Sequence, residues 1–110
     1  MYNNRLEQLK LFLKDTPNDP FLHYAMALEY LKLGEDQQAL SIFTQLIETS
    51  PNYVGTYYHR GKLQEKLKMF DDALMTYKVG METARKLQDN HSYSELLSAY
   101  NSLHDELSDW

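Results

Sequence analysis

The chain has 110 residues, the length of one ordinary domain. It contains no cysteine, which excludes disulfide bonds and thiolate metal sites, and its formal net charge of −5 disfavours non-specific binding to nucleic acid. No apolar stretch approaches the roughly 18 residues of a membrane span, and the start of the chain is polar where a secretory signal would be apolar. We therefore expect a cytoplasmic protein that binds neither nucleic acid nor membrane.

The first predicted element is an amphipathic helix over residues 4–16. Apolar residues recur at helical spacing along one of its faces. They are Leu6, Leu9, Phe12 and Leu13. The helix should end before Pro17, because the residue that precedes a proline is disfavoured in the helical conformation.

Residues 20–53 contain the pattern of two helices. Asp19 is a favourable N-cap, and Pro20 suits the first helical position, where its missing N–H has no partner to lose. Gly34 is a typical residue for the end of the first helix. The second helix should end before Pro51. This segment is therefore predicted to be a pair of antiparallel helices.

Residues 54–87 repeat this arrangement. A shift of 34 residues superposes identical or similar residues along the whole segment. Pro17-Asn18 falls on Pro51-Asn52, Tyr24 on Tyr58, Lys32-Leu33 on Lys66-Leu67, Ala39-Leu40 on Ala73-Leu74, and Glu48-Thr49 on Glu82-Thr83. A chance offset would give only a couple of identities, so the segment is an internal repeat. It predicts two further helices joined by a turn near Lys68.

A last amphipathic helix is expected over residues 91–108. A stack of repeats needs an end helix with a polar outer face to cover the last exposed core. The polar residues available for that face are Ser92, Ser94, Glu95, Ser98, Asn101, Asp105 and Glu106. This helix is therefore predicted to be a cap.

The period and the spaced residues resemble the tetratricopeptide repeat, whose pattern is W-x2-L-G-x2-Y…A-x3-F…P over 34 residues. The two units read His23-x2-Met26-Ala27-x2-Tyr30…Ala39-x3-Phe43…Pro51 and Tyr57-x2-Arg60-Gly61-x2-Gln64…Ala73-x3-Tyr77…Arg85. The resemblance implies an all-α fold of antiparallel helix pairs, stacked as a short right-handed α-solenoid of about six helices. Residues 1–110 then form a single domain, with a half-repeat at its start and the cap at its end.

Small residues of the pattern are interpreted as the places where helices cross. Ala27 and Gly61 are expected to face Ala39 and Ala73 across each pair, because small side chains let antiparallel helices approach closely. Tyr77 would fill the wider space one turn further along.

Residue clusters that suggest catalysis or metal binding are weak. The carboxylate pairs Glu35-Asp36 and Asp71-Asp72 stand at helix starts, where negative charge complements the helix dipole. No nucleophile-elbow, phosphate-loop or dinucleotide-binding glycine pattern is present. The four histidines share no metal-ligand spacing: His23, His59, His91 and His104. We expect no enzyme activity, no metal and no cofactor.

In the resembled family, the first helix of each repeat lines a concave groove through its second, fifth, ninth, twelfth and thirteenth positions. Here these positions hold Phe21, Tyr24, Leu28, Leu31 and Lys32 in the first unit and Gly55, Tyr58, Lys62, Glu65 and Lys66 in the second. The resemblance implies a surface that is aromatic and aliphatic at one end and basic at the other, which suits a peptide with carboxylates. The alternative is that Tyr24 and Leu28 are buried beneath the first helix and that the lysines are only solvated.

The implied function is a protein–protein interaction module, an adaptor or scaffold that binds a peptide or a partner protein in this groove. The alternative is a self-associating structural protein, such as a homodimer, whose groove is filled by its own partner chain. Leu103, Leu107 and Trp110 are the candidate donors for that contact.

Family members that hold the acidic C-terminal tails of heat-shock chaperones use Lys at the fifth position and Asn at the ninth. This sequence has Tyr24 and Leu28 at those positions in the first unit, and Tyr58 and Lys62 in the second. The clamp for chaperone tails is therefore not expected here.

Overall fold

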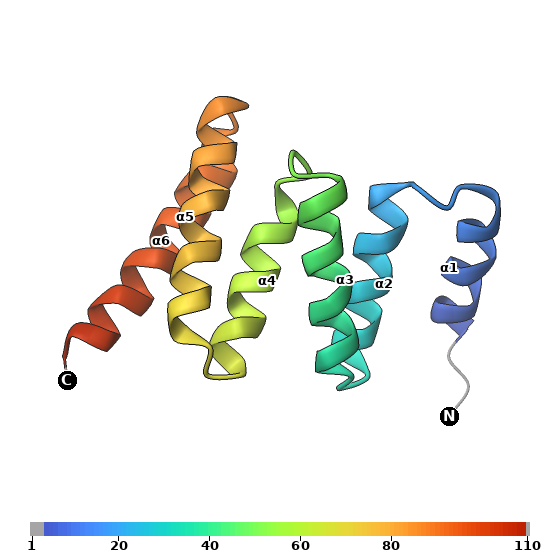
Figure 1. The fold of residues 1–110 in the computed structure, drawn as a ribbon, viewed down its shortest axis with the longest axis horizontal. Helices are drawn as coiled ribbons and strands as arrows, with labels where there is room; N and C mark the ends of the chain where they lie inside the picture. The colour runs from blue at the N-terminus through green and yellow to red at the C-terminus, as the bar shows by residue number, and fades with distance from the viewer. Residues whose placement is uncertain (1–3, 110) are drawn as a thin grey trace. The chain divides into compact units, whose positions relative to one another are not determined.

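The computed structural model describes residues 4–109 and, within that range, contains six α-helices and no strand. The helices are α1 (Asn4–Asp15), α2 (Pro20–Lys32), α3 (Asp36–Thr49), α4 (Gly55–Lys66), α5 (Phe70–Lys86) and α6 (Asn90–Ser108) (Figure 1). The all-α prediction is confirmed. Trp110 and the first three residues of the polar start lie outside the described residues.

The chain divides into two compact units, Met1–Ser50 and Pro51–Trp110. We call them the N-terminal unit, which contains α1 to α3, and the C-terminal unit, which contains α4 to α6. Within each unit, consecutive helices run antiparallel to one another (Figure 1). Short connections between neighbouring helices produce this arrangement.

The helix ends follow the predicted signals. The Asp19 carboxylate accepts the backbone N–H of Phe21 at 2.9 Å, and Pro20 begins α2. Gly34 has a φ of 77°, the left-handed conformation that commonly ends a helix. Lys68 occupies the same place after α4 with a φ of 63°. The turn type therefore recurs in the second unit although the glycine does not.

The core of the N-terminal unit joins α1 to α2. Its buried members are Leu6, Leu9, Leu22, Ala25 and Met26, with Leu13, Tyr30 and Ile42 packed against them. Full burial of one leucine contributes about 1.5–3 kcal/mol, so this cluster is a main source of the unit's stability. Phe12, which was expected on the same face, is 53% exposed. Leu9 and Leu13 are four residues apart and pack together in the contact with α2. Phe12 lies at the edge of this face.

The core of the C-terminal unit is built around two tyrosines. Tyr57 and Tyr77 are almost fully buried. A Cβ added to Gly61 would overlap the ring of Tyr77, whose atoms are the three nearest to that position. The ring of Tyr77, one turn from Ala73, therefore takes the space directly beside Gly61. That Ala73 also faces Gly61 stays a prediction. A Cβ on Gly80 would likewise come within 2.6 Å of the Tyr57 Cβ.

The departures from the repeat pattern in α4 form a polar network with α5. Thr76 Oγ1 donates to Gln64 Oε1 at 2.6 Å, and a guanidinium N–H of Arg60 donates to Thr76 Oγ1 at 3.4 Å. Gln64 and Thr76 are buried, and buried polar side chains are stable only when they are hydrogen-bonded. Arg60 and Gln64 thus stand where the pattern has apolar and aromatic residues, and the buried Gln64 is hydrogen-bonded to Thr76.

Candidate functional site

The candidate site in the C-terminal unit is a shallow groove between α4 and α6. It encloses about 220 Å³, and Tyr58 and Lys62 line it from α4. The structure thus brings two of the predicted residues together. The remaining lining residues come from α6: Glu95, Ser98, Ala99 and Ser102.

Lys62 is held in place by two neighbours on its own helix. Its Nζ lies 5.9 Å from the centre of the Tyr58 ring, within the range of a cation–π contact. The same Nζ is 3.9 Å from a carboxylate oxygen of Glu65. Lys62 remains half exposed, so its charge is available at the groove.

Glu65 has a second role that the sequence did not predict. Its carboxylate accepts a hydrogen bond from the hydroxyl of Tyr77, which is buried in α5. Burial, together with this hydrogen bond, raises the pKa of Tyr77 well above its ordinary value of 10.0. Glu65 therefore connects α4 to α5, while Lys66 in the last turn of α4 is exposed.

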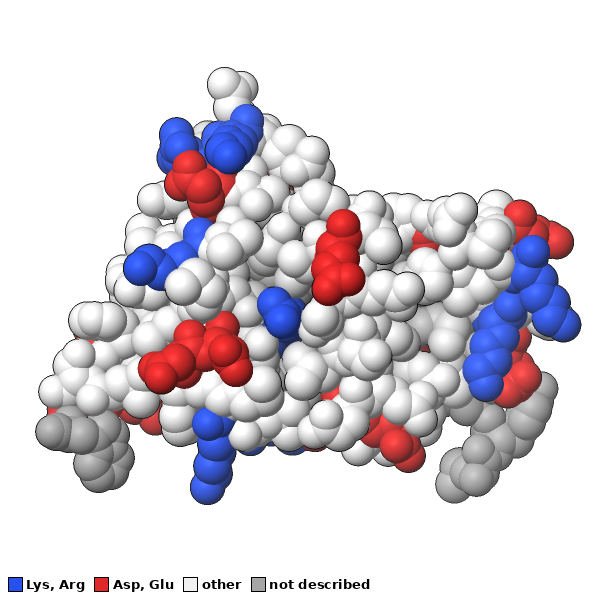
Figure 2. Space-filling view, viewed as in Figure 1, with Lys and Arg blue, Asp and Glu red and all other residues white. Residues whose placement is uncertain are grey.

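The groove carries charges of both signs. Glu95 lines it from α6 and Lys62 from α4, so the surface is not simply basic. On the face drawn in Figure 2, Lys and Arg side chains are likewise interspersed with Asp and Glu. Burial of His59 lowers the pKa of its imidazole, and the negative charge of Glu95 opposes that shift in part.

The predicted residues of the N-terminal unit lie along α2. Phe21 is 52% exposed, and Leu28 and Leu31 are partly buried. The ring of Tyr24 lies 6.4 Å from that of Phe43 in α3. Lys32 is exposed, with its Nζ 3.8 Å from a carboxylate oxygen of Glu29.

The buried cluster that joins α1 to α2 includes neither Tyr24 nor Leu28, which are both partly buried. The cluster that joins α1 to α2 uses Leu22, Ala25 and Met26 from α2. These residues lie on another face of α2 from Tyr24, whose ring meets α3.

The residues of α6 that line the groove were not predicted from the sequence, because this helix was expected only as a cap. A usable signal is present: Tyr93-x2-Leu96-Leu97-x2-Tyr100 has the spacing of the first helix of a repeat. Counted from Asn90, Ser98 and Ser102 then occupy the ninth and thirteenth positions, which the family uses for its groove.

His23 has a structural partner. Its Nε2 lies 2.6 Å from the carbonyl oxygen of Pro17, and since a carbonyl can only accept, this nitrogen carries the proton. In the second unit, the Tyr57 hydroxyl donates to the carbonyl of Pro51, also at 2.6 Å. The two contacts are 34 residues apart. The first position of the repeat pattern thus anchors the preceding proline turn in both units.

Residues 4–109 contain no group of three or more His, Asp or Glu side chains placed to hold a metal ion. Within the same range, no helix combines the length and apolar character needed to cross a membrane.

Of the residues proposed to donate a self-association contact, Leu103 is not available for it. Leu103 is 2% exposed and belongs to the core of its own unit, and Leu107 is partly buried. Trp110 lies outside the described residues. The helical spacing of α6 places Leu103 one and two turns from the buried Ala99 and Leu96, which explains its burial.

The sequence model of the tetratricopeptide repeat matches residues 21–53. The crystal structure of a tetratricopeptide repeat domain protein from Salinibacter ruber is similar, with a TM-score of 0.76 and 48% identity over 78% of this chain and 97% of that chain. The TPR2B domain of yeast Sti1, in its pHsp70 complex, shares the fold with a TM-score of 0.83 and 21% identity, covering 92% of this chain and 81% of that chain. Hsp70-Hsp90 organizing protein 2 of Arabidopsis thaliana is 33% identical over 64% of this chain, which spans 12% of that protein.

Proposed function

Because the chain belongs to the tetratricopeptide repeat family, we propose that it is a cytoplasmic protein-interaction module, without catalytic activity, that binds a peptide segment of another protein. The observation that supports this proposal is the groove between α4 and α6. There an aromatic ring, a positioned ammonium group and two exposed hydroxyls lie together: Tyr58, Lys62, Ser98 and Ser102.

The groove suits a short extended segment that carries a carboxylate. Tyr58 offers a large surface with few rotatable bonds, so contact with it costs little side-chain entropy. Lys62 supplies the positive charge, and the hydroxyls of Ser98 and Ser102 can bind the peptide groups of the ligand. Glu95 limits the match to segments whose acidic group lies on the Lys62 side of the groove.

The ligand that we propose differs from the acidic C-terminal tail of a heat-shock chaperone. Where family members of that type have Lys and Asn, this chain has Tyr58 and Lys62 in the second repeat and Tyr24 and Leu28 in the first. A synthetic peptide with such a tail should therefore give no saturable binding in isothermal titration calorimetry. Saturable binding would show that other residues replace the clamp.

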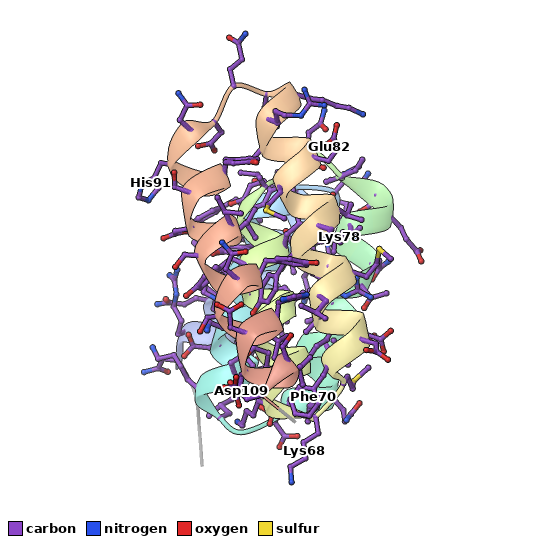
Figure 3. The ribbon with its side chains drawn as sticks, turned by 90° about the vertical axis from the view of Figure 1, so that its left-hand side faces the viewer. Lys68, Phe70, Lys78, Glu82, His91 and Asp109 are labelled. Carbon is purple, nitrogen blue, oxygen red and sulfur yellow. The ribbon has the colours of Figure 1, made fainter. Side chains whose placement is uncertain are left out.

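The test is affinity capture of the natural partner from an extract of the source organism with wild-type and variant protein. Tyr58→Ala should weaken capture by about 2 kcal/mol if the ring is a hot spot of the contact. Lys62→Glu should also weaken it, because the variant opposes the carboxylate of the ligand. Lys78→Glu is the matched control: it makes the same charge change at an exposed position of α5, outside the lining of the groove (Figure 3).

Thermal melts of the three variants should stay close to that of the wild type, which separates binding from stability. Equal capture by wild type, Tyr58→Ala and Lys62→Glu would contradict the groove as the binding site. Light scattering on the same samples reports their mass. Conversion of a dimer into a monomer by the groove variants would support self-association instead.

A further inference from the structure

Another open cavity lies in the N-terminal unit, between the connection from α1 to α2, the start of α2 and the C-terminal half of α3. It encloses about 280 Å³. Its apolar walls come from Pro17 and Pro20 on one side and from Ile42 and Leu46 on the other. The groove proposed above belongs to the other unit and shares no residue with this cavity.

The cavity is explained by one departure from the repeat pattern. His23 lines it and stands where the pattern has tryptophan. The hydrogen bond from its Nε2–H to the Pro17 carbonyl holds the imidazole against the turn. In the C-terminal unit the same position carries Tyr57, a larger ring that is 1% exposed and donates to Pro51. The N-terminal unit therefore lacks the volume of a large aromatic ring at this point.

The lining limits the charge of a ligand. The described residues that line the cavity include no Asp, Glu, Lys or Arg. The cavity also adjoins the C-terminal end of α3, whose partial charge is negative. The last turn of that helix has no basic residue and contains Glu48. An uncharged group is therefore favoured there over a carboxylate.

The volume limits the size of a ligand. A cavity of about 150 Å³ is enough for benzene, whereas pockets for drug-sized ligands begin near 300 Å³. At about 280 Å³ this cavity is suited to one large aromatic side chain and not to a nucleotide or a larger cofactor. The exposed Asn18 and Gln45 stand among its lining residues and offer amides that can bond to the peptide groups beside such a side chain.

We propose that this cavity binds a single uncharged aromatic side chain, above all the indole of a tryptophan, presented by the peptide chain of a partner protein. The ligand supplies the aromatic ring that the repeat pattern has at the position of His23. This site does not depend on the function proposed for the groove between α4 and α6.

The test uses N-acetyl-L-tryptophanamide as the probe and the ¹H–¹⁵N spectrum of the full chain as the readout. The amide signals of Asn18, Gln45, Thr49 and Ser50 should shift saturably, with a Kd of about 1 mM, as expected for a fragment of this size. N-acetyl-L-alaninamide, which lacks the ring, should cause no saturable shift. N-acetyl-L-tryptophan, which carries a free carboxylate, should bind several-fold more weakly.

Two variants and a control locate the site. His23→Trp should fill the cavity with the chain's own indole and abolish the shifts. Tyr57→Trp, at the equivalent position of the other unit, should leave binding unchanged. Gln45→Ala changes an exposed residue and should weaken binding several-fold, which keeps the test valid if His23→Trp does not fold.

Three results would overturn the proposal. The first is the absence of saturable shifts in residues 17–50 with the tryptophan amide. The second is a set of shifts centred on Tyr58 and Ser98, which would assign the probe to the other groove. The third is unchanged binding by a folded His23→Trp variant.

Discussion

Gly61 and Tyr77 depend on each other at the contact between α4 and α5. The tyrosine ring is fully buried against the glycine, and its hydroxyl is bonded to Glu65. A methyl group on residue 61 would collide with a ring that cannot move without losing that bond. Gly61→Ala should therefore lower the free energy of unfolding by about 1–3 kcal/mol, the usual cost of overpacking. Urea denaturation measures this change.

The N-terminal unit supplies the control for this argument. Its equivalent residues are Ala27 and Phe43, which are both fully buried. Adding Tyr77→Phe to Gly61→Ala rebuilds that pair and frees the ring from Glu65, so the double variant should lose less stability than the sum of the single variants. An unchanged urea midpoint for Gly61→Ala alone would show that the ring moves aside easily.

The imidazole of His59 makes stability depend on pH. Burial lowers its pKa from the ordinary value of 6.5, and the charge of Glu95 offsets this only in part. The unfolded chain therefore binds the proton more readily than the folded chain does. The contribution of neutral His59 to stability should be fully present above about pH 6.5 and should be lost as the pH falls from that value through the folded-state pKa.

His59→Gln should reduce this loss, which melting temperatures at about pH 7.5 and pH 5.5 would measure. The exposed His104 provides the control variant, His104→Gln, for the removal of a histidine at the surface. If wild type and His59→Gln lose the same number of degrees on acidification, the acid sensitivity has another origin.

At the scale of the elements, the ends of the helices decide the spacing of the repeats. Pro51 limits α3, which ends at Thr49. Arg85 replaces the corresponding proline in the second unit, so α5 continues to Lys86 and ends where Gln88 adopts a φ of 59°. The added length delays the start of α6, and the groove positions of that helix no longer follow the 34-residue period.

Lys68 tests the energetics of these helix ends. It adopts the left-handed conformation that Gly34 adopts in the first unit, at a cost of about 1–2 kcal/mol for a residue with a Cβ. Lys68→Gly removes this cost, but the glycine makes the unfolded chain more flexible, which lowers stability in part. We therefore expect a net stabilisation of about 0.5–1 kcal/mol. Chemical denaturation provides the measurement.

The reverse change is the matched control. Nothing lies within 4 Å of a Cβ placed on Gly34, so Gly34→Lys introduces backbone strain without a steric clash. It should destabilise the protein by about the amount that Lys68→Gly gains. A destabilised Lys68→Gly variant would mean that the lysine side chain makes a contact more valuable than the strain it causes.

At the scale of the whole molecule, the net charge of −5 contrasts with the positive charge that Lys62 brings to the groove. If the partner is acidic, Glu95 repels it and Lys62 attracts it. Glu95→Gln should then strengthen capture and Lys62→Glu should weaken it, each by about 0.2–1 kcal/mol, as exposed charge pairs do. Both effects should shrink when the salt concentration rises from about 0.05 M to 0.5 M, because salt screens exposed charges.

Glu106→Gln, at an exposed position of the same helix α6, controls for the loss of one negative charge. Weaker capture by Glu95→Gln would show that the ligand carries a basic group at this point of the groove. Effects that do not change with salt would show that the two side chains act through shape.

The amino-acid sequence by itself determined the helices and their order. Helix formation depends on neighbours three and four residues away and on capping residues, and these signals are local. As predicted, Asp19 caps the start of α2 and Gly34 follows its end. The 34-residue repeat predicted α4 and α5 from α2 and α3. The family pattern also indicated Tyr58 and Lys62, which the structure places in one groove.

The tertiary structure decided the pairings between helices. Local spacing could not show that Tyr77 lies against Gly61 or that Glu65 is bonded to the Tyr77 hydroxyl. Nor could it place Glu95 beside Lys62, because the extra length of α5 shifts the register of α6. Which side chains meet across two helices depends on rotation and packing, and each of these adjusts to residues far away along the chain.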